Sequence, residues 1–319
     1  MSAEALPAER LPQQRVPEFF IIGQHKSGTT ALYEMLRRHP QIYMPELKEP
    51  RFFDSDLHSV ARTSANSGRP ETYGEYLALF EGAAPEQRIG EASASYLRSV
   101  LAASAIAAAQ PRARCIAILR EPASFVRSLH SQLVQEHVER EKDLRRAVAG
   151  EEIVRDGRTV RRYSDHIRYV EQLRRFHEAF PSEQVLVLIY DDFRGENEAT
   201  VRKVLRFLEV DDSAPIEVLE ANPSVAVRSL RMDSVVRGIY GGRSPVTRAM
   251  KGAVKALTPE RVHGSALATV RRRLVYRSQE PADERLMREL RTRYQGEVVA
   301  LSEYLDRDLV SLWGYDDLG

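Results

Sequence analysis

The clearest hydrophobic pattern lies near the start of the chain, where a short apolar run is followed by a helical pattern. Residues 19–22 read Phe-Phe-Ile-Ile, and the run ends at Gly23. A continuous run rich in β-branched and aromatic residues is typical of a strand buried on both faces. Apolar residues then recur at helical spacing within 31–40, and Pro40 limits this helix. The pattern predicts a strand, a glycine-containing loop and a helix in close succession.

The same alternation continues along the chain. Further strands are predicted at 88–92, 114–120 and 184–192, and helices at 123–139, 163–180, 196–210 and 281–306. Strands that alternate with helices favour parallel pairing. We therefore expect an α/β fold with three layers, in which a central, mainly parallel sheet is flanked by helices.

Domain organisation is indicated by local composition. Residues 1–17 are polar with three prolines and predict a flexible leader, and no repeat or low-complexity linker divides 18–319, which predicts a single domain. Residues 138–162 are nearly all charged or small and predict an exposed loop or helix with little core. Residues 224–280 hold twelve Lys or Arg against three acids, an excess of nine. Two interpretations stay open for 224–280, a solvated or mobile segment and a mobile basic cover that attracts an anionic ligand.

The composition of the chain argues against several classes of function. The chain has 319 residues, 43% of them hydrophobic and 29% charged, and its 47 Lys and Arg nearly balance 46 Asp and Glu. This balance argues against a basic surface for nucleic acid, and the single Cys115 excludes a disulfide framework or a cysteine-rich zinc site. No apolar run reaches the roughly 20 residues that span a bilayer, and the amino terminus lacks the apolar core of a signal peptide. We expect a cytoplasmic protein without a membrane or nucleic-acid partner.

The loop after the first strand has the chemistry of an anion site. Residues 23–30 read Gly-Gln-His-Lys-Ser-Gly-Thr-Thr. Backbone N–H groups at the start of a helix attract anions, Gly28 allows close approach of the backbone, and Lys26 adds a positive charge. Hydroxyl groups that can donate hydrogen bonds stand at Ser27, Thr29 and Thr30. The loop therefore predicts binding of a phosphate-like group.

This loop departs from the nucleotide-triphosphate loop G-x-x-x-x-G-K-[ST] in one respect. Gly23 and Gly28 have the required separation and Thr30 stands at the hydroxyl position, as in a P-loop-like domain. Thr29 replaces the lysine, however, and the basic residue is Lys26. This displacement argues against ordinary magnesium–nucleotide chemistry.

The Lys-Ser-Gly-Thr-Thr segment between a strand and a helix resembles the 5′-phosphosulfate loop of sulfotransferases that use 3′-phosphoadenosine 5′-phosphosulfate (PAPS). The family also places an Arg at a strand end and a Ser eight residues later on the 3′-phosphate, which match Arg120 and Ser128. The resemblance covers most of 18–212. It implies PAPS as donor, adenosine 3′,5′-bisphosphate as product, and Lys26 as the group that stabilises the leaving phosphate. No metal is expected, since basic residues neutralise the charge.

Two other segments resemble the carbohydrate-type branch of that family, which includes heparan sulfotransferases and many bacterial relatives. Residues 45–56 resemble its K-E-x-x-F-F segment, which implies that Glu49 is the catalytic base. Residues 88–97 resemble its E-[KA]-[ST]-x-x-Y segment, which places Glu91, Ser93 and Tyr96 near the active cleft. Alternates for the base are Asp54, Asp56 and His58, and contacts with the substrate are expected from His25, Lys48, Arg51, Glu91 and Tyr96.

Departures from the heparan pattern limit what the resemblance implies about the acceptor. Ala92 stands where several heparan enzymes have lysine, and Pro50 and Arg51 also depart from their pattern, so specificity for glycosaminoglycans is not implied. We expect transfer to a hydroxyl group of a sugar or of a small-molecule natural product. Two alternatives stay open, an ATP- and magnesium-dependent P-loop phosphotransferase and a non-enzymatic module that binds anions or nucleic acid through 224–280.

Overall fold

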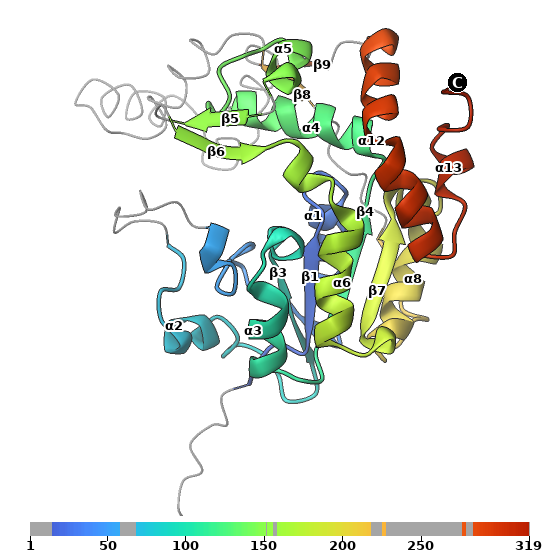
Figure 1. Cartoon of the computed structure of the whole chain (residues 1–319). Coiled ribbons are helices and arrows are strands. Elements are labelled where there is room, and N and C mark those ends of the chain that lie inside the picture. The colour runs from blue at the N-terminus through green and yellow to red at the C-terminus, as the bar shows by residue number, and fades with distance from the viewer. Residues whose placement is uncertain are drawn as a thin grey trace, which may run out of the picture. The chain divides into compact units, whose positions relative to one another are not determined.

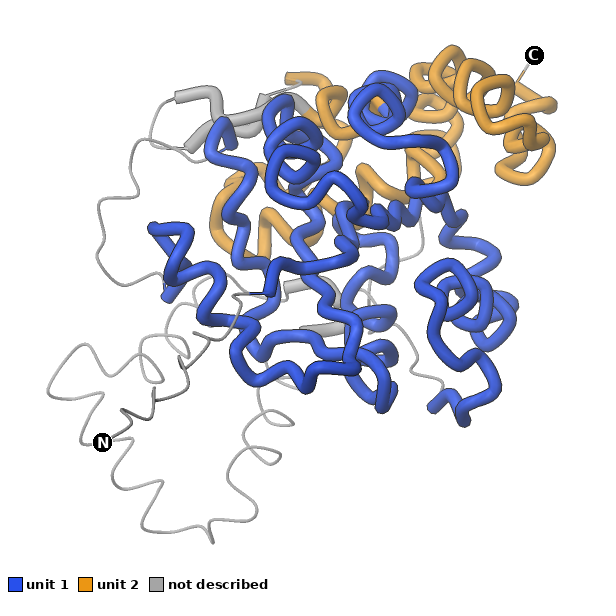
Figure 2. The backbone as a smooth tube through the Cα atoms, turned by 90° about the horizontal axis from the view of Figure 1, so that it is seen from below, with its two compact units in different colours: residues 1–120, 169–221 blue, residues 121–168, 222–319 orange. Residues whose placement is uncertain are grey.

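The structure is a computed structural model that describes residues 15–57, 68–150, 152–155, 158–217, 225–227, 276–278 and 283–318. Two units can be distinguished, each made of two stretches of the chain (Figure 2). Unit 1 comprises 1–120 and 169–221, and unit 2 comprises 121–168 and 222–319. Most of the expected leader and almost all of the basic segment 224–280 lie outside the described residues.

A five-stranded parallel sheet forms the centre of unit 1 (Figure 1). Its strands are β1 (Phe19–Gly23), β2 (Ile42–Tyr43), β3 (Arg88–Ala92), β4 (Arg114–Leu119) and β7 (Val185–Ile189). Their order is β2-β3-β1-β4-β7, and every neighbouring pair is parallel. The prediction of a mainly parallel sheet is confirmed.

Helices cover both faces of this sheet. The α-helices of unit 1 are α1 (Thr29–Arg37), α2 (Tyr73–Ala78), α3 (Ala102–Ala109), α6 (Tyr169–Ala179), α7 (Tyr190–Gly195) and α8 (Asn197–Phe207). Phe19 and Ile21 of β1 share a buried core with side chains of α1 and α8. Because side chains alternate along a strand, the equally buried Phe20 and Ile22 face the opposite layer, where α3 and α6 lie over the sheet (Figure 1). The expected three-layer α/β fold is confirmed.

One predicted boundary is wrong at the end of β7. The strand expected over 184–192 ends at Ile189, and α7 starts immediately after it. Asp191 and Asp192 lie in the first turn of α7, where acidic side chains stabilise a helix because they face the positive end of its dipole. The strand therefore ends where the apolar run gives way to these two acids.

Unit 2 is built from helices and short strands, and one of its helices is capped at its amino terminus by Glu121. Its described elements are α4 (Pro122–Gln135), α5 (Leu144–Ala149), β5 (Glu152–Arg155), β6 (Arg158–Arg162), β8 (Val225–Val227), β9 (Tyr276–Ser278), α12 (Glu284–Tyr304) and α13 (Leu309–Leu312). The Glu121 carboxylate accepts hydrogen bonds from two first-turn N–H groups of α4 and, at 2.6 Å, from the Tyr315 hydroxyl. No helix in the described ranges, α12 included, is long and apolar enough to cross a membrane.

The interpretation of 138–162 as a segment with little core needs correction. Part of it forms α5, which is capped by Asp143, whose side chain accepts a hydrogen bond from the Arg146 N–H. Ala147 and Val148 on this helix are buried. Short apolar residues among charges were enough to place one face of α5 in the core of unit 2.

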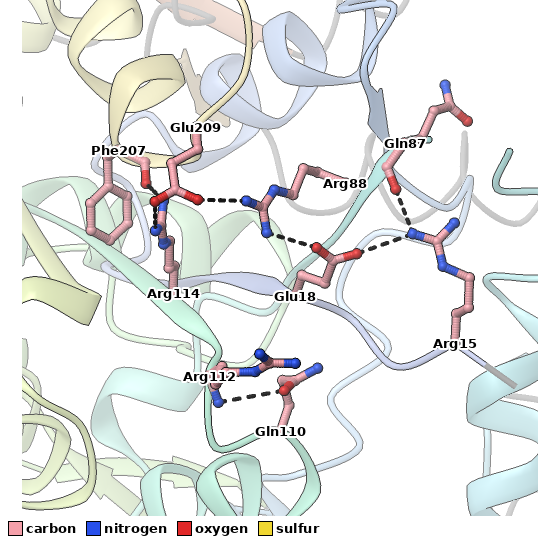
Figure 3. Close-up of polar contacts among 9 residues, drawn as sticks. All are labelled: Arg15, Glu18, Gln87, Arg88, Gln110, Arg112, Arg114, Phe207 and Glu209. Atoms are coloured by element: carbon pink, nitrogen blue, oxygen red, sulfur yellow. Dashed lines mark hydrogen bonds and ion pairs between the residues drawn. The ribbon is translucent and has the colours of Figure 1, made fainter. Parts of the chain in front are cut away.

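Ion pairs join the strands of unit 1 at the amino edge of the sheet (Figure 3). Arg88, the first residue of β3, donates to Glu18 at 2.9 Å and to Glu209 at 2.7 Å. Arg114, the first residue of β4, also contacts Glu209, and Arg15 pairs with Glu18 at 3.1 Å. Such partly exposed pairs each contribute little stability, but a network fixes how neighbouring strands start. The side chains of these residues therefore make structural contacts at the amino edge of the sheet, away from the carboxyl ends of the strands.

Candidate active site

The candidate site residues follow the carboxyl ends of neighbouring parallel strands. The loop 24–28 follows β1, Ser93 follows β3, Arg120 follows β4 and Tyr190 follows β7. The carboxyl ends of parallel strands meet at one edge of the sheet, and ligands of open α/β folds bind at that edge. The topology therefore gathers residues that are far apart in the sequence.

The loop 24–28 connects β1 to α1 through a left-handed backbone. Lys26 has a φ of 60°, and Gly28, which caps α1, has a φ of 89°. The Gln24 N–H donates to the Ile118 carbonyl of β4 at 2.9 Å, and the buried Ser27 hydroxyl donates to the His25 carbonyl at 3.3 Å. The residue that precedes α1 is Gly28, which has no side chain to cap the helix, and the amino terminus of a helix offers its first-turn N–H groups to an anion.

The hydroxyl residues at the end of the loop lie within the helix. Thr29 and Thr30 are the first two residues of α1, which begins earlier than the sequence pattern indicated. Thr29 is buried, whereas Thr30 is exposed. Their backbone N–H groups belong to the first turn and face the same end of the helix as the loop. The predicted contacts of Ser27, Thr29 and Thr30 with a phosphate stay predictions.

Gly28→Ala is expected to destabilise unit 1. A Cβ atom at Gly28 would lie 2.9 Å from two ring atoms of Phe193, and the positive φ disfavours any other residue. We expect a loss of about 1–3 kcal/mol in the free energy of unfolding. Gly74→Ala is the matched control, because nothing lies within 4 Å of a Cβ there and its φ is not positive. Urea denaturation compares the two variants, and equal losses would contradict the packing argument.

The Arg120 guanidinium reaches the loop after β1. Its Nη1 donates to the Lys26 carbonyl oxygen at 2.9 Å. The guanidinium also lies over the Tyr190 ring, 4.7 Å from its centroid, in a cation–π contact. The Tyr169 hydroxyl donates to the Arg120 carbonyl oxygen at 2.9 Å. Two segments that the sequence assigns to separate phosphate groups therefore touch each other within unit 1.

Ser128, the expected partner of Arg120, lies on α4 and is buried. The helix belongs to unit 2, whereas Arg120 belongs to unit 1. The pairing of Ser128 with Arg120 on one phosphate group therefore stays a prediction from their spacing.

Glu49 lies on the loop between β2 and α2, next to the loop after β1. Its carboxylate accepts a hydrogen bond from the Lys48 ammonium at 3.1 Å. Burial raises the pKa of Glu49, but the positive charges of His25, Lys48 and Arg51 outweigh it and lower the pKa below its ordinary value. Because His25 belongs to the loop 24–28, this interaction places the carboxylate beside that loop. Glu49 is therefore ionised at neutral pH and able to accept a proton.

The alternate carboxylates make structural contacts. Asp54 is fully buried and accepts from Arg51 Nε at 2.8 Å. Asp56 accepts from the Ser99 hydroxyl at 2.5 Å and from the Val100 N–H at 2.9 Å, which fixes the turn before α3. The remaining alternate, His58, lies outside the described residues. Both described alternates thus already accept hydrogen bonds from neighbouring groups of unit 1.

Glu91 and Tyr96, which were expected to contact the substrate, are fully buried. The Glu91 Oε2 accepts hydrogen bonds from the hydroxyls of Tyr76 at 3.0 Å and Tyr96 at 2.8 Å. Burial raises the pKa of Glu91 to about 7, although the hydroxyls of Ser93, Tyr96 and Tyr76 oppose this rise. In this structure Glu91 and Tyr96 contact each other, and their contact with a substrate stays a prediction.

Three aromatic residues at this edge were missed by the sequence reasoning. Tyr190 stacks on Arg120, Phe193 packs against Gly28, and Tyr169 holds the Arg120 carbonyl. A signal for Tyr190 was available, since it directly follows the apolar run of β7 and therefore stands at the carboxyl edge of the sheet. Phe193 and Tyr169 carry no such local signal, because their helices bring them to the site through tertiary packing.

Comparison with known proteins finds sulfotransferases both by sequence and by structure. A family model described as the sulfotransferase family matches residues 17–214. Human carbohydrate sulfotransferase 15 is 33% identical over 142 residues, which cover 34% of this chain and 25% of the human protein. The membrane-associated sulfotransferase kil1 of Dictyostelium discoideum is 30% identical over 107 residues, covering 34% of this chain and 21% of that protein. The matches thus span a quarter or less of the length of these relatives.

Among solved structures, a sulfotransferase from Alicyclobacillus acidocaldarius has a similar fold. Superposition of the two structures gives a TM-score of 0.66 at 23% sequence identity. It covers 94% of this chain and 99% of the other. The likeness extends over nearly the whole chain. It agrees with the expected P-loop-like α/β fold class.

Proposed function

Since the chain belongs to the sulfotransferase family, we propose that it transfers the sulfuryl group of PAPS to a hydroxyl group of a sugar or of a small-molecule natural product. One observation carries the choice of donor, the 2.9 Å hydrogen bond from Arg120 Nη1 to the Lys26 carbonyl. It brings a guanidinium to the loop expected to bind phosphosulfate. Two basic residues from distant segments then serve one donor that is anionic at two places.

The groups around the loop 24–28 suit a phosphosulfate. They are the first turn of α1 and the cationic Lys26, both of which donate hydrogen bonds. When bound, PAPS would supply an activated sulfuryl group. Lys26 and the first-turn N–H groups would stabilise negative charge on the leaving phosphate, and Arg120 with Ser128 would hold the 3′-phosphate.

Glu49 is proposed as the general base. Its carboxylate lies beside His25, is ionised at neutral pH, and is held by Lys48. It can therefore take the proton from an acceptor hydroxyl as the oxygen attacks sulfur. Asp54 and Asp56 are less suited, because their carboxylates are occupied by Arg51 and by the turn at Ser99.

The relatives and the proposed base support the acceptor class. One relative is named as a carbohydrate sulfotransferase, which supports a sugar hydroxyl or a comparable hydroxyl of a small molecule. The proposal includes no metal, because cationic side chains and N–H groups neutralise the leaving phosphate. In the described ranges, no three or more His, Cys, Asp or Glu side chains gather into a metal site.

The proposed donor is tested by calorimetric titration with adenosine 3′,5′-bisphosphate and with AMP. We expect the bisphosphate to bind at least about tenfold more tightly, because a charge-assisted contact with a second phosphate is worth more than 1 kcal/mol. Arg120→Ala should remove most of this preference. Arg112→Ala, which changes an exposed arginine at the opposite edge of the sheet, is the control.

Two results would count against the donor assignment. The first is equal affinity of the unaltered protein for the bisphosphate and AMP. The second is an equal loss of affinity in the Arg120 and Arg112 variants. Sulfate transfer from labelled PAPS to a panel of sugars and hydroxylated metabolites then tests the reaction itself.

A further inference from the structure

The loop that carries Glu49 is held by the segment after β3. The N–H groups of four loop residues donate to this segment. Glu49 donates to Ala92 O at 2.9 Å, Arg51 to Ser93 Oγ at 3.0 Å, and Phe52 and Phe53 to Tyr96 Oη at 3.0 Å and 3.4 Å. Glu49 and Arg51 have φ values of 60° and 57°. Residues other than glycine rarely adopt such a backbone unless surrounding contacts enforce it. The position of the Glu49 carboxylate therefore depends on these four contacts.

The contact at Phe52 requires a correctly oriented hydroxyl. A hydroxyl group has one hydrogen and two lone pairs, so it accepts from an N–H only if its hydrogen points elsewhere. The Tyr96 hydrogen is directed to the Glu91 carboxylate, which accepts it at 2.8 Å. An ionised carboxylate can only accept. Glu91 thereby turns the lone pairs of Tyr96 towards the Phe52 N–H.

We propose that Glu91 is a positioning residue, which fixes the loop carrying Glu49 through the hydroxyl of Tyr96. The role rests on the proposed function, in which Glu49 is the base. Glu91 has no exposed surface, so it acts on the reaction only through the residues that it holds. The structure thus connects the end of β3 to the catalytic carboxylate by a path of two hydrogen bonds and a short stretch of backbone.

Tyr76 offers a matched control within the same cluster. Its hydroxyl also donates to Glu91 Oε2, at 3.0 Å, and its ring stacks on Phe52 with centroids 4.7 Å apart. Among the described residues, no N–H of the loop donates to the Tyr76 hydroxyl. Tyr76→Phe and Tyr96→Phe therefore each remove one hydroxyl from Glu91 and keep the ring, but only the second breaks the link to Phe52.

Protonation of Glu91 should loosen the same link. The groups that face its carboxylate are Tyr76 from α2, Tyr96 from the turn after β3, Ser93, and Asp54 with its partner Arg51. A protonated Glu91 can donate to the Tyr96 oxygen and compete there with the Phe52 N–H. Since the pKa of Glu91 is raised to about 7, this change falls near neutral pH. Protection of the loop should then increase as the pH rises through 7.

Hydrogen exchange in peptides that cover 45–54 tests the proposal without relying on activity. We expect Tyr96→Phe to lower the protection factor of the loop about tenfold, as loss of one hydrogen bond does, and Tyr76→Phe to change it by less than about twofold. Glu91→Gln can still accept from the Tyr96 hydroxyl but does not titrate, so it should abolish the rise in protection near pH 7. Equal losses in the two tyrosine variants, or an unchanged loop in Tyr96→Phe, would overturn the proposal.

Steady-state kinetics test the connection to Glu49. Tyr96→Phe should lower kcat about tenfold with little change in KM for PAPS, because the base is displaced while the donor site is intact. Tyr76→Phe should keep kcat within about twofold. A mobile loop with unchanged kcat would overturn the positioning role. If the unaltered protein transfers no sulfate, the proposed function fails, while hydrogen exchange still decides whether Glu91 holds the loop.

Discussion

Replacing Lys26 with alanine should lower kcat by about 10²–10³-fold while the protein stays folded, since removal of one preorganised donor to a developing charge typically has this effect. The side chain extends from the loop before α1, whose first-turn N–H groups supply the rest of the anion site. Neutral N–H groups can still bind the donor when the ammonium is gone. The loss should therefore appear mainly in kcat rather than in affinity.

The structure makes this substitution informative, because the contact between Lys26 and Arg120 uses the backbone. Arg120 donates to the Lys26 carbonyl, which alanine also provides. Lys26 is already a residue other than glycine at a positive φ, so alanine adds no backbone strain. Single-turnover transfer from labelled PAPS measures the chemical step, and Lys203→Ala, an exposed position on α8, is the control. A loss of less than about threefold would exclude Lys26 from charge stabilisation.

Much of unit 1 could be predicted from the sequence, because its central elements carry strong local signals. The apolar run of β1, the glycine loop and the amphipathic α1 follow each other directly, and the loop motif then indicates an anion. Parallel pairing follows from the alternation of strands with helices. The weakly patterned elements were missed, such as the two-residue β2 and the alanine-rich α3, whose residues lack a clear polar face.

The roles of buried polar residues could not be predicted in this way. Motif resemblance places Glu91 and Tyr96 near the active cleft, but both side chains are fully buried. The contact between the Tyr96 hydroxyl and the Phe52 N–H depends on how the loop 49–54 packs against the end of β3. That packing is a tertiary property, set by the cluster of rings around Phe52 rather than by any local pattern. A buried carboxylate and an exposed one look alike in a sequence.

Two glutamates at the same edge of the sheet illustrate how their surroundings assign different roles. The cations His25, Lys48 and Arg51 lower the pKa of Glu49, while burial raises that of Glu91 to about 7. Opposite shifts in neighbouring acids commonly separate a reacting group from a supporting one. Glu49 is ionised and partly accessible and can exchange a proton with an acceptor. Glu91 is fully buried, so it cannot reach an acceptor and can only orient the hydroxyl groups that contact it.

Glu49→Gln should lower kcat by about 10²–10⁴-fold, the usual contribution of a general base. Glutamine preserves the size of the side chain and can still accept from Lys48, so the loop should keep its conformation. Affinity for adenosine 3′,5′-bisphosphate should be unchanged, because the base contacts the acceptor rather than the donor. Glu46→Gln makes the same chemical change three residues earlier, where the side chain is 93% exposed, and should leave kcat unaltered.

The pH dependence provides an independent check on Glu49. Because its pKa is lowered, the carboxylate stays ionised as the pH falls through the ordinary range for glutamate, and activity that depends on it should be lost only below that range. The protonation of Glu91 near pH 7 should add a shallower decrease, which Glu91→Gln removes. If Glu49→Gln retained kcat within about threefold, the proton would have to leave through another group, and Asp54 and Asp56 would be the next carboxylates to replace.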